Sequence, residues 1–108
     1  MSELLPATIR EQLPTIREAE AQGLAAQALV KFFTPDADWT WYASAFEPNH
    51  EIFFGLVIGF VPEFGSFGLA ELQAARGPLG LPIERDEQFE PATLRELRDH
   101  YKATGWAK

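Results

Sequence analysis

IFFGLVIGFV, residues 52–61, is the longest apolar run in the chain, and it decides the kind of fold to expect. Its β-branched and aromatic residues favour a strand over a helix. Because the run is apolar at odd and even positions alike, both faces of this strand should be covered, as in a central strand. Gly55 and Gly59 fall on one face, where they should mark bends or let a helix pack closely.

Two further segments of strand composition precede this run. They are ALVKFF at residues 28–33 and WTWYASAF at residues 39–46, with the turn sequence PDAD between them. Such segments joined by a short turn rich in Pro and Asp predict an antiparallel hairpin. A short fourth strand is expected around Ser66 and Phe67.

The other segments have the composition of helices. Residues 1–23 are rich in helix formers, and residues 69–76 and 91–104 carry apolar side chains at helical spacing. The order of helix, strands and helices predicts a single α+β domain over residues 1–108. We expect a small antiparallel sheet of three to four strands within residues 27–68, with flanking short helices and a C-terminal helix that all lie to one side of it.

The charge balance argues against direct nucleic-acid binding. Nine Lys and Arg face sixteen Asp and Glu, which leaves the chain at −7. Residues 1–54 carry three basic and eight acidic side chains, and residues 55–108 carry six and eight. Neither half has the basic cluster that displaces counterions from a duplex. The acidic surface favours solubility, or a contact with a basic partner protein.

Composition also limits the chemistry and the location to be expected. The chain has no cysteine, which excludes disulfides and thiolate metal sites, and its only histidines are His50 and His100. We therefore expect no metal site and no cofactor. The N-terminal stretch lacks the features of a secretory signal, and the longest apolar run is about half a membrane span. We expect a cytoplasmic protein without membrane contact.

Known catalytic templates do not fit the sequence. His50 and Glu51 begin like the zinc-protease helix, but Phe54 stands where the second histidine belongs. Neither Ser44 nor Ser66 lies in a nucleophile elbow. No catalytic residue is assigned on these grounds.

One polar cluster follows a loop rich in Gly and Pro. Its members are Glu84, Arg85, Asp86 and Glu87. Carboxylates beside an arginine could do acid–base work if they were desolvated. The alternative is a loop held by an ion pair between Arg85 and Asp86, Glu84 or a carboxylate of another element.

An aromatic group also has two interpretations. Trp39 and Trp41 should share a strand face and could stack against a small ligand or a sugar. Packing in the core is favoured, because a domain of this size needs large side chains to fill its interior. Both tryptophans are therefore expected to be mostly buried.

Four motifs together resemble a known protein family. They are VKFFTP at residues 30–35, WTWY at 39–42, FFGLV at 53–57 and RGPLGLPIERD at 76–86. They resemble a family of short bacterial proteins described as a domain of unknown function, often encoded on plasmids, integrative elements and phages. The resemblance covers about residues 24–90. It implies an accessory role, in some cases against host defence, and it brings no catalytic residues.

The sequence thus favours a non-enzymatic protein-interaction module. Its partner would be a protein bound through an acidic surface, for which the candidates are Glu18, Glu20, Asp36 and Asp38, all expected to be exposed. A small enzyme using the 84–87 loop and a small-ligand binder using the aromatic face are the alternatives. Exposed tryptophans would favour the ligand binder, a hollow around Arg85 the enzyme, and a flat acidic surface the module. The sequence indicates no oligomeric state.

Overall fold

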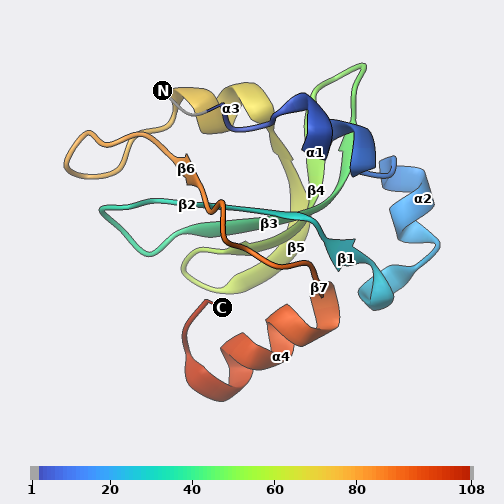
Figure 1. Cartoon of the computed structure of the whole chain (residues 1–108). Helices are drawn as coiled ribbons and strands as arrows, with labels where there is room; N and C mark the ends of the chain where they lie inside the picture. Colours follow the sequence, from blue (N-terminus) through green and yellow to red (C-terminus); the bar gives the residue numbers. More distant parts are fainter. Residues whose placement is uncertain (1–2, 108) are drawn as a thin grey trace.

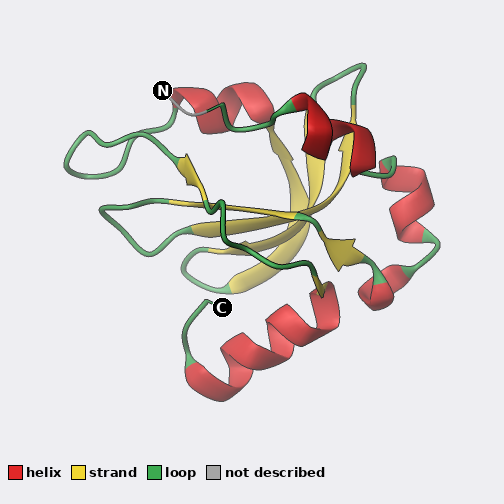
Figure 2. Ribbon diagram, viewed as in Figure 1, coloured by secondary structure: helices red, strands yellow, loops and turns green. Residues whose placement is uncertain are grey.

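The computed structural model describes residues 3–107, and its centre is an antiparallel sheet of five strands in the order β5-β4-β3-β2-β6 (Figures 1 and 2). The strands are β2 (Val30–Phe33), β3 (Thr40–Glu47), β4 (Ile52–Ile58), β5 (Pro62–Gly68) and β6 (Glu84–Arg85). A separate ladder pairs β1 (Gln27–Ala28) with β7 (Ala92–Thr93). The α+β fold and the antiparallel hairpins are confirmed. The main sheet has one strand more than the expected three to four, because β6 joins β2 from far along the chain.

Helices cover both faces of this sheet rather than one. The helices are α1 (Ala7–Gln12), α2 (Ile16–Glu20), the 3-10 turn η1 (Gly23–Ala25), α3 (Leu69–Ala74) and α4 (Leu94–Thr104). Figure 1 shows α1 and α3 on one face and α4 on the other. The expectation of helices on one side was wrong. The physical reason lies in β4, whose apolar side chains on both faces each need a cover.

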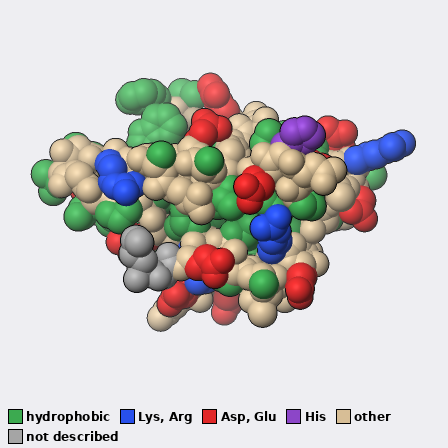
Figure 3. Space-filling model, turned by 90° about the horizontal axis from the view of Figure 1, so that it is seen from above, with side chains coloured by type: hydrophobic (Ala, Val, Ile, Leu, Met, Phe, Trp, Pro, Cys, Tyr) green, Lys and Arg blue, Asp and Glu red, His purple; other side chains and the backbone are tan. Residues whose placement is uncertain are grey.

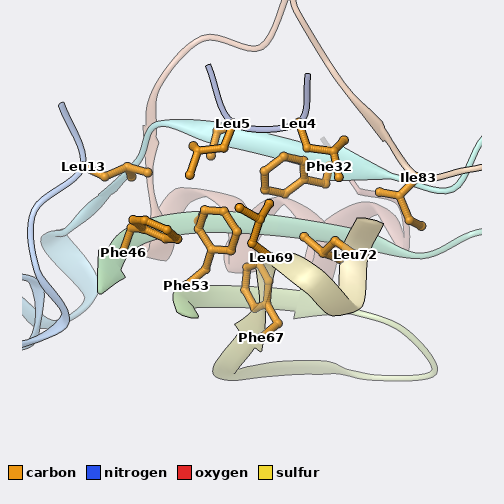
Figure 4. Packing of buried hydrophobic residues seen from close by; sticks show 12 residues of the cluster. Leu4, Leu5, Leu13, Phe32, Phe46, Phe53, Phe67, Leu69, Leu72 and Ile83 are labelled. Carbon is orange, nitrogen blue, oxygen red and sulfur yellow. The ribbon is translucent and has the colours of Figure 1, made fainter. Parts of the chain in front are cut away.

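The face under α1 and α3 is packed with phenylalanine rings (Figure 4). Phe53 of β4 lies at the centre, fully buried, with ring centroids 4.8 Å from Phe46, 5.3 Å from Phe67 and 5.4 Å from Phe32. Burying one such ring stabilises the fold by about 1.5–3 kcal/mol. Leucine and isoleucine side chains from other elements complete this cluster: Leu4, Leu5, Leu13, Leu69, Leu72 and Ile83.

The face under α4 is packed differently, with small residues around a few large ones. Its large members are Tyr42, Leu56 and Ile58 of the sheet with Leu94 and Leu97 of α4. The small members are Ala19, Ala26, Ala28, Ala45 and Ala92. Alanines at these positions let the covering segments approach the sheet closely.

A β-bulge in β3 changes which side chains face each core. Ala43 pairs with Gly55 and Ala45 with Phe54, so Ser44 is an extra residue between them. The Ser44 hydroxyl donates to the Phe54 carbonyl at 3.3 Å. A Cβ at Gly55 would overlap the Tyr42 carbonyl oxygen. Gly55 therefore allows a close approach of two strands.

The ends of α4 follow from local chemistry. Thr93 accepts the Glu96 N–H at 3.1 Å while Glu96 accepts the Thr93 N–H at 3.0 Å, which forms a capping box. Gly105 closes the helix with a φ of 73°, a conformation that favours glycine. The helix begins at Leu94 rather than at residue 91, because β7 pairs with β1 first. Within residues 3–107, no helix has the length and apolarity to cross a membrane.

Candidate functional site

Exposed large apolar side chains gather at one end of the sheet, here called the loop end. Residues 34–39 between β2 and β3 form its centre (Figure 1, left). Asp36 joins them to residues 77–81 before β6, Trp39 joins them to residues 59–61 between β4 and β5, and they border one hollow with residues 105–107 after α4. Their exposed apolar side chains are Trp39, Phe60, Val61, Leu79, Leu81 and Trp106. The sequence pattern did not indicate this cluster, because residues far apart in the chain form it.

Trp39 is the aromatic centre of the loop end. Its ring lies 6.0 Å from that of Trp41 in a stacked arrangement and 5.5 Å from that of Phe60 in an edge-on one. A Cβ at Gly59 would come within 2.5 Å of the Trp39 ring, so the indole lies directly on this glycine. The shared face of the two tryptophans is confirmed. Their predicted burial was wrong for Trp39, which is 36% exposed, while Trp41 is half-buried against the core.

Asp36 ties two of these segments together. Its Oδ2 accepts the Leu79 N–H at 2.8 Å and the Leu81 N–H at 3.4 Å. Its Oδ1 is buried, lies where a Cβ of Gly77 would be, and has no hydrogen-bond partner within residues 3–107. Asp36 was expected to be exposed, and this was wrong, because it is half-buried. Its carboxylate orders the 77–81 loop instead.

The other three acidic candidates are exposed, but they do not form one surface. Glu18 and Glu20 lie on α2, at the opposite end of the molecule from the turn that carries Asp38 (Figure 1). On the face shown in Figure 3, acidic side chains lie in separate groups with neutral and apolar surface between them. The flat acidic patch that would have favoured an electrostatic module is therefore not assembled from these residues.

Glu18 has a structural role of its own. Its carboxylate accepts the Thr15 N–H at 3.0 Å, and the Thr15 hydroxyl accepts the Glu18 N–H at 3.2 Å. The backbone hydrogen bond from Thr15, followed by one from the Thr15 side chain, holds the pKa of Glu18 below its ordinary value of 4.5. This capping box fixes the start of α2.

The 84–87 cluster is held by ion pairs. Arg85 Nη2 lies 3.4 Å from Glu87 Oε1, and its Nε donates to the Glu3 carbonyl at 3.3 Å. Lys31 Nζ lies 3.5 Å from Asp86 Oδ2. Arg85 therefore pairs with a carboxylate, as in the structural interpretation, but the carboxylate belongs to Glu87 rather than to Glu84 or Asp86. Arg85 and Asp86 are half-buried, whereas Glu84 and Glu87 are exposed.

A hollow of about 620 Å³ adjoins this cluster, lined by Lys31, Phe33 and residues 84–88. A hollow around Arg85 was the feature expected to favour an enzyme, and it is present. Its cationic side chains, Lys31 and Arg85, are already engaged with carboxylates. No group of three His, Cys, Asp or Glu side chains within residues 3–107 is placed to hold a metal ion. The geometry explains how the loop is fixed on the sheet.

A second hollow, of about 370 Å³, lies between the loop end and the end of α4. Its lining residues include Phe33, Tyr101 and Trp106, and Trp39 borders it, with the Trp39 ring turned onto Gly59 and Trp41. Asp38 is its acidic member, and it shares Lys31 and Phe33 with the first hollow. The two hollows are therefore neighbours on the α4 face of the sheet.

Fold and surface together define a small α+β domain on an antiparallel sheet, with an apolar loop end and two open hollows beside it. The chain belongs to the family described as protein of unknown function (DUF2958), whose sequence profile matches residues 4–104. The resemblance to a family of unknown function is thus confirmed, and the match extends beyond residues 24–90 at both ends. No protein with a curated description and no solved structure matches the chain.

Proposed function

We propose that this protein is a non-enzymatic interaction module that binds a partner protein through its loop end. The observation that carries the proposal is the concentration of exposed apolar side chains there, with Phe60 at 91%, Leu79 at 80% and Trp106 at 71% exposure. Contiguous exposed apolar surface on a small domain is typical of interaction sites. The contact would be apolar at its centre, with the exposed Asp38 at its polar rim.

The loops of this surface are held in place by the sheet beneath them. The Trp39 N–H donates to the Thr34 hydroxyl at 3.0 Å, and Asp36 fixes the 77–81 loop through two backbone N–H groups. Binding residues on loops fixed to a rigid scaffold lose little conformational entropy when a partner docks. A pre-ordered loop end supports binding rather than catalysis.

The biological setting of this proposal comes from the resemblance alone. Short proteins of bacterial mobile elements are often accessory factors, and some act against host defence. A module without catalytic machinery would act there by occupying a surface of a host protein. We extend the proposal to such an accessory role in the bacterial cytoplasm.

The test compares substitutions to serine at two exposed positions at opposite ends of the molecule. Phe60→Ser removes the most exposed loop-end ring, and Glu20→Ser changes an exposed residue on α2. Tagged variants are expressed in the native host, and captured proteins are quantified by mass spectrometry. A partner that is lost with Phe60→Ser and retained with Glu20→Ser, at unchanged melting temperature, supports the proposal. A partner retained equally by both variants and by Leu79→Ser and Trp106→Ser contradicts it.

A second candidate function is small-ligand binding in the hollow of about 370 Å³. The exposure of Trp106 favours it, since an accessible indole that lines a hollow together with Tyr101 can stack on a flat ligand or a sugar. NMR screening of sugars and nucleosides would reveal such a ligand through shifts at these two rings. Saturable shifts that Trp106→Ala abolishes would favour the ligand binder over the protein-binding module.

A further inference from the structure

The outer edge of β5 is open within residues 3–107, because β5 is the last strand of the sheet and pairs only with β4. The pairing fixes which groups face outward. The Leu69 N–H donates to the Glu51 carbonyl at 2.9 Å and the Gly59 N–H to the Val61 carbonyl at 3.4 Å. Antiparallel pairs alternate between bonded and non-bonded. The odd-numbered residues of β5 therefore bond to β4, and Phe64 and Ser66 direct their N–H and C=O groups outward.

This edge has few of the features that usually block strand addition. Natural edges are protected by lysines, prolines, bulges or a covering segment. In β5, Pro62 stands at the first position and Glu63 is the only charged side chain. Ser66 is exposed and Phe64 is 41% exposed. The middle of the edge, from Phe64 to Ser66, thus offers two free N–H groups and two free carbonyls to another strand.

An apolar hollow of about 190 Å³ reaches the edge strand at Phe64. Its wall comes from α2, η1, the start of α4 and the sheet: Ala19, Glu20, Gly23, Ala26, Ser44, Phe54, Phe64 and Leu94. Phe64 and Ser66 pair with Leu56 and Phe54, so their side chains share the α4 face with this hollow. A strand added to β5 would direct every second side chain toward the same face.

We infer that the outer edge of β5 binds an extended basic peptide segment of a partner. Backbone bonds to Phe64 and Ser66 would hold the segment, and an aliphatic side chain would enter the hollow. Glu63 is the only charged residue on β5, and its side chain lies on the face opposite to the hollow, where every second side chain of the segment would also point. Glu20 is the only charged residue that lines the hollow, so lysine or arginine on the segment is complementary to a carboxylate on either face. This site is separate from the loop end and does not rest on it.

Charge also argues for a peptide rather than a second copy of the chain. Each copy carries −7, and pairing two β5 edges would bring two Glu63 side chains onto one small ladder. Like charges at such distances oppose association. A basic segment would be attracted to Glu63 rather than repelled by it, so charge favours a basic peptide over a second copy of the chain at this edge.

The test uses a fluorescein-labelled peptide of alternating lysine and valine as the probe. Anisotropy should show saturable binding, and NMR should show that hydrogen exchange at the Phe64 and Ser66 amides slows when the peptide is added. A peptide of alternating glutamate and valine, and a lysine–valine peptide N-methylated at alternate residues, should both fail to bind. No binding of the lysine–valine peptide, or equal binding of all three, overturns the inference.

Substitutions at one position separate the backbone from the side chain. Ser66→Pro removes the outward N–H at a place where an edge strand tolerates proline, and it should weaken binding by about three- to tenfold. Ser66→Ala keeps the N–H and should bind as the natural chain does.

Glu20→Lys, on an exposed helix position, should also weaken peptide binding. If Ser66→Pro fails to fold, unchanged peptide binding by Glu20→Lys overturns the inference. Phe60→Ser should leave peptide binding unchanged even if it abolishes the loop-end contact. A dimer that Ser66→Pro dissociates in sedimentation would overturn the inference in favour of a second copy.

Discussion

Asp36 shows how a single charged side chain can order a loop that has no regular structure. The 77–81 segment is rich in Gly and Pro; the bridge between Arg76 and Pro82 closes it, and the Gly77 N–H donates to the Leu81 carbonyl within it. An ionised carboxylate that accepts two backbone N–H groups makes stronger hydrogen bonds than a neutral acceptor would. Gly77 leaves room for that carboxylate, since a Cβ there would overlap it. Acid and glycine therefore act together, although they lie far apart in the sequence.

Asp36→Ala should lower the free energy of unfolding by about 1–3 kcal/mol, because it removes the acceptor of the Leu79 and Leu81 N–H groups. Asp38→Ala is the matched control, since Asp38 is exposed in the same turn, and it should change stability by less than about 0.5 kcal/mol. Urea unfolding followed by tryptophan fluorescence measures both. Equal destabilisation by the two variants would show that the turn, rather than the Asp36 carboxylate, determines the effect.

Glu18 should make stability depend on pH. Its folded-state pKa lies below 4.5 because of its hydrogen bonds with Thr15, so the unfolded chain binds the proton more readily. Stability from this group is present above the unfolded pKa and is lost as the pH falls through the folded value. At neutral pH, Glu18→Ala should therefore have a lower free energy of unfolding than the natural chain. This difference should shrink below about pH 4.5. Glu20→Ala, on the same helix but outside the capping box, is the control for removing an exposed carboxylate from α2.

At the scale of the elements, the long strands and the C-terminal helix were predictable from the sequence, and the two-residue strands were not. The strands β2, β3 and β4 and the helix α4 follow from residues 28–33, 39–46, 52–61 and 91–104 with shifts at the ends. The two-residue strands β6 and β7 carry no pattern of their own, and they exist because the folded sheet and β1 offer them partners. The burial of β3 also escaped prediction, since the bulge at Ser44 breaks its alternation.

Candidate site residues were predictable only in part, for a related reason. Residue type shows that Glu18, Asp38 and the 84–87 cluster are charged, but tertiary pairing decides which carboxylate meets which cation. The sequence put Trp39 in the core because of its size. In the structure Trp39 lies at the sheet end, where the strand ladder stops and no helix covers it. The apolar loop end depends on the meeting of four distant turns, which no local pattern encodes.

The register of β5 predicts an alternating pattern of hydrogen exchange in the free protein. Amides of Glu63, Gly65 and Phe67 bond to β4 and should be protected, whereas those of Phe64 and Ser66 face solvent and should exchange rapidly. NMR exchange at neutral pH resolves the five amides individually. Protection of Phe64 and Ser66 in the absence of peptide would mean that another segment or a second copy already covers the edge.

At the scale of the whole molecule, two unlike cores enclose one sheet and leave two kinds of surface free. Phenylalanine rings fill one face and alanines bring the covering segments close on the other. The loop end and the outer edge of β5 are what this arrangement leaves uncovered within residues 3–107. One surface is apolar and the other offers backbone hydrogen bonds, so they suit partners of different chemistry.

The charge of the whole molecule predicts that it does not bind duplex DNA or RNA at physiological salt. Its nine Lys and Arg are outnumbered by sixteen Asp and Glu. Within residues 3–107, four of them already face a carboxylate within 4 Å, namely Arg10, Lys31, Arg85 and Arg98. Affinity for a duplex depends on how many cationic side chains replace phosphate counterions, so few contacts give little binding. Fluorescence anisotropy with a labelled duplex should stay flat across a protein titration.

The decisive control for this prediction is the salt dependence. A protein that contacts phosphates binds more weakly as salt rises, with a slope proportional to the number of contacts. This chain should show no such slope, whereas its association with the lysine–valine peptide should weaken with salt, because there the acidic side chains are the attracting partners. Tight binding to a duplex with a steep salt slope would mean that local arrangement of the nine cations outweighs the net charge of −7. The sign of the net charge would then no longer identify the partner, and the basic peptide would lose its electrostatic argument as well.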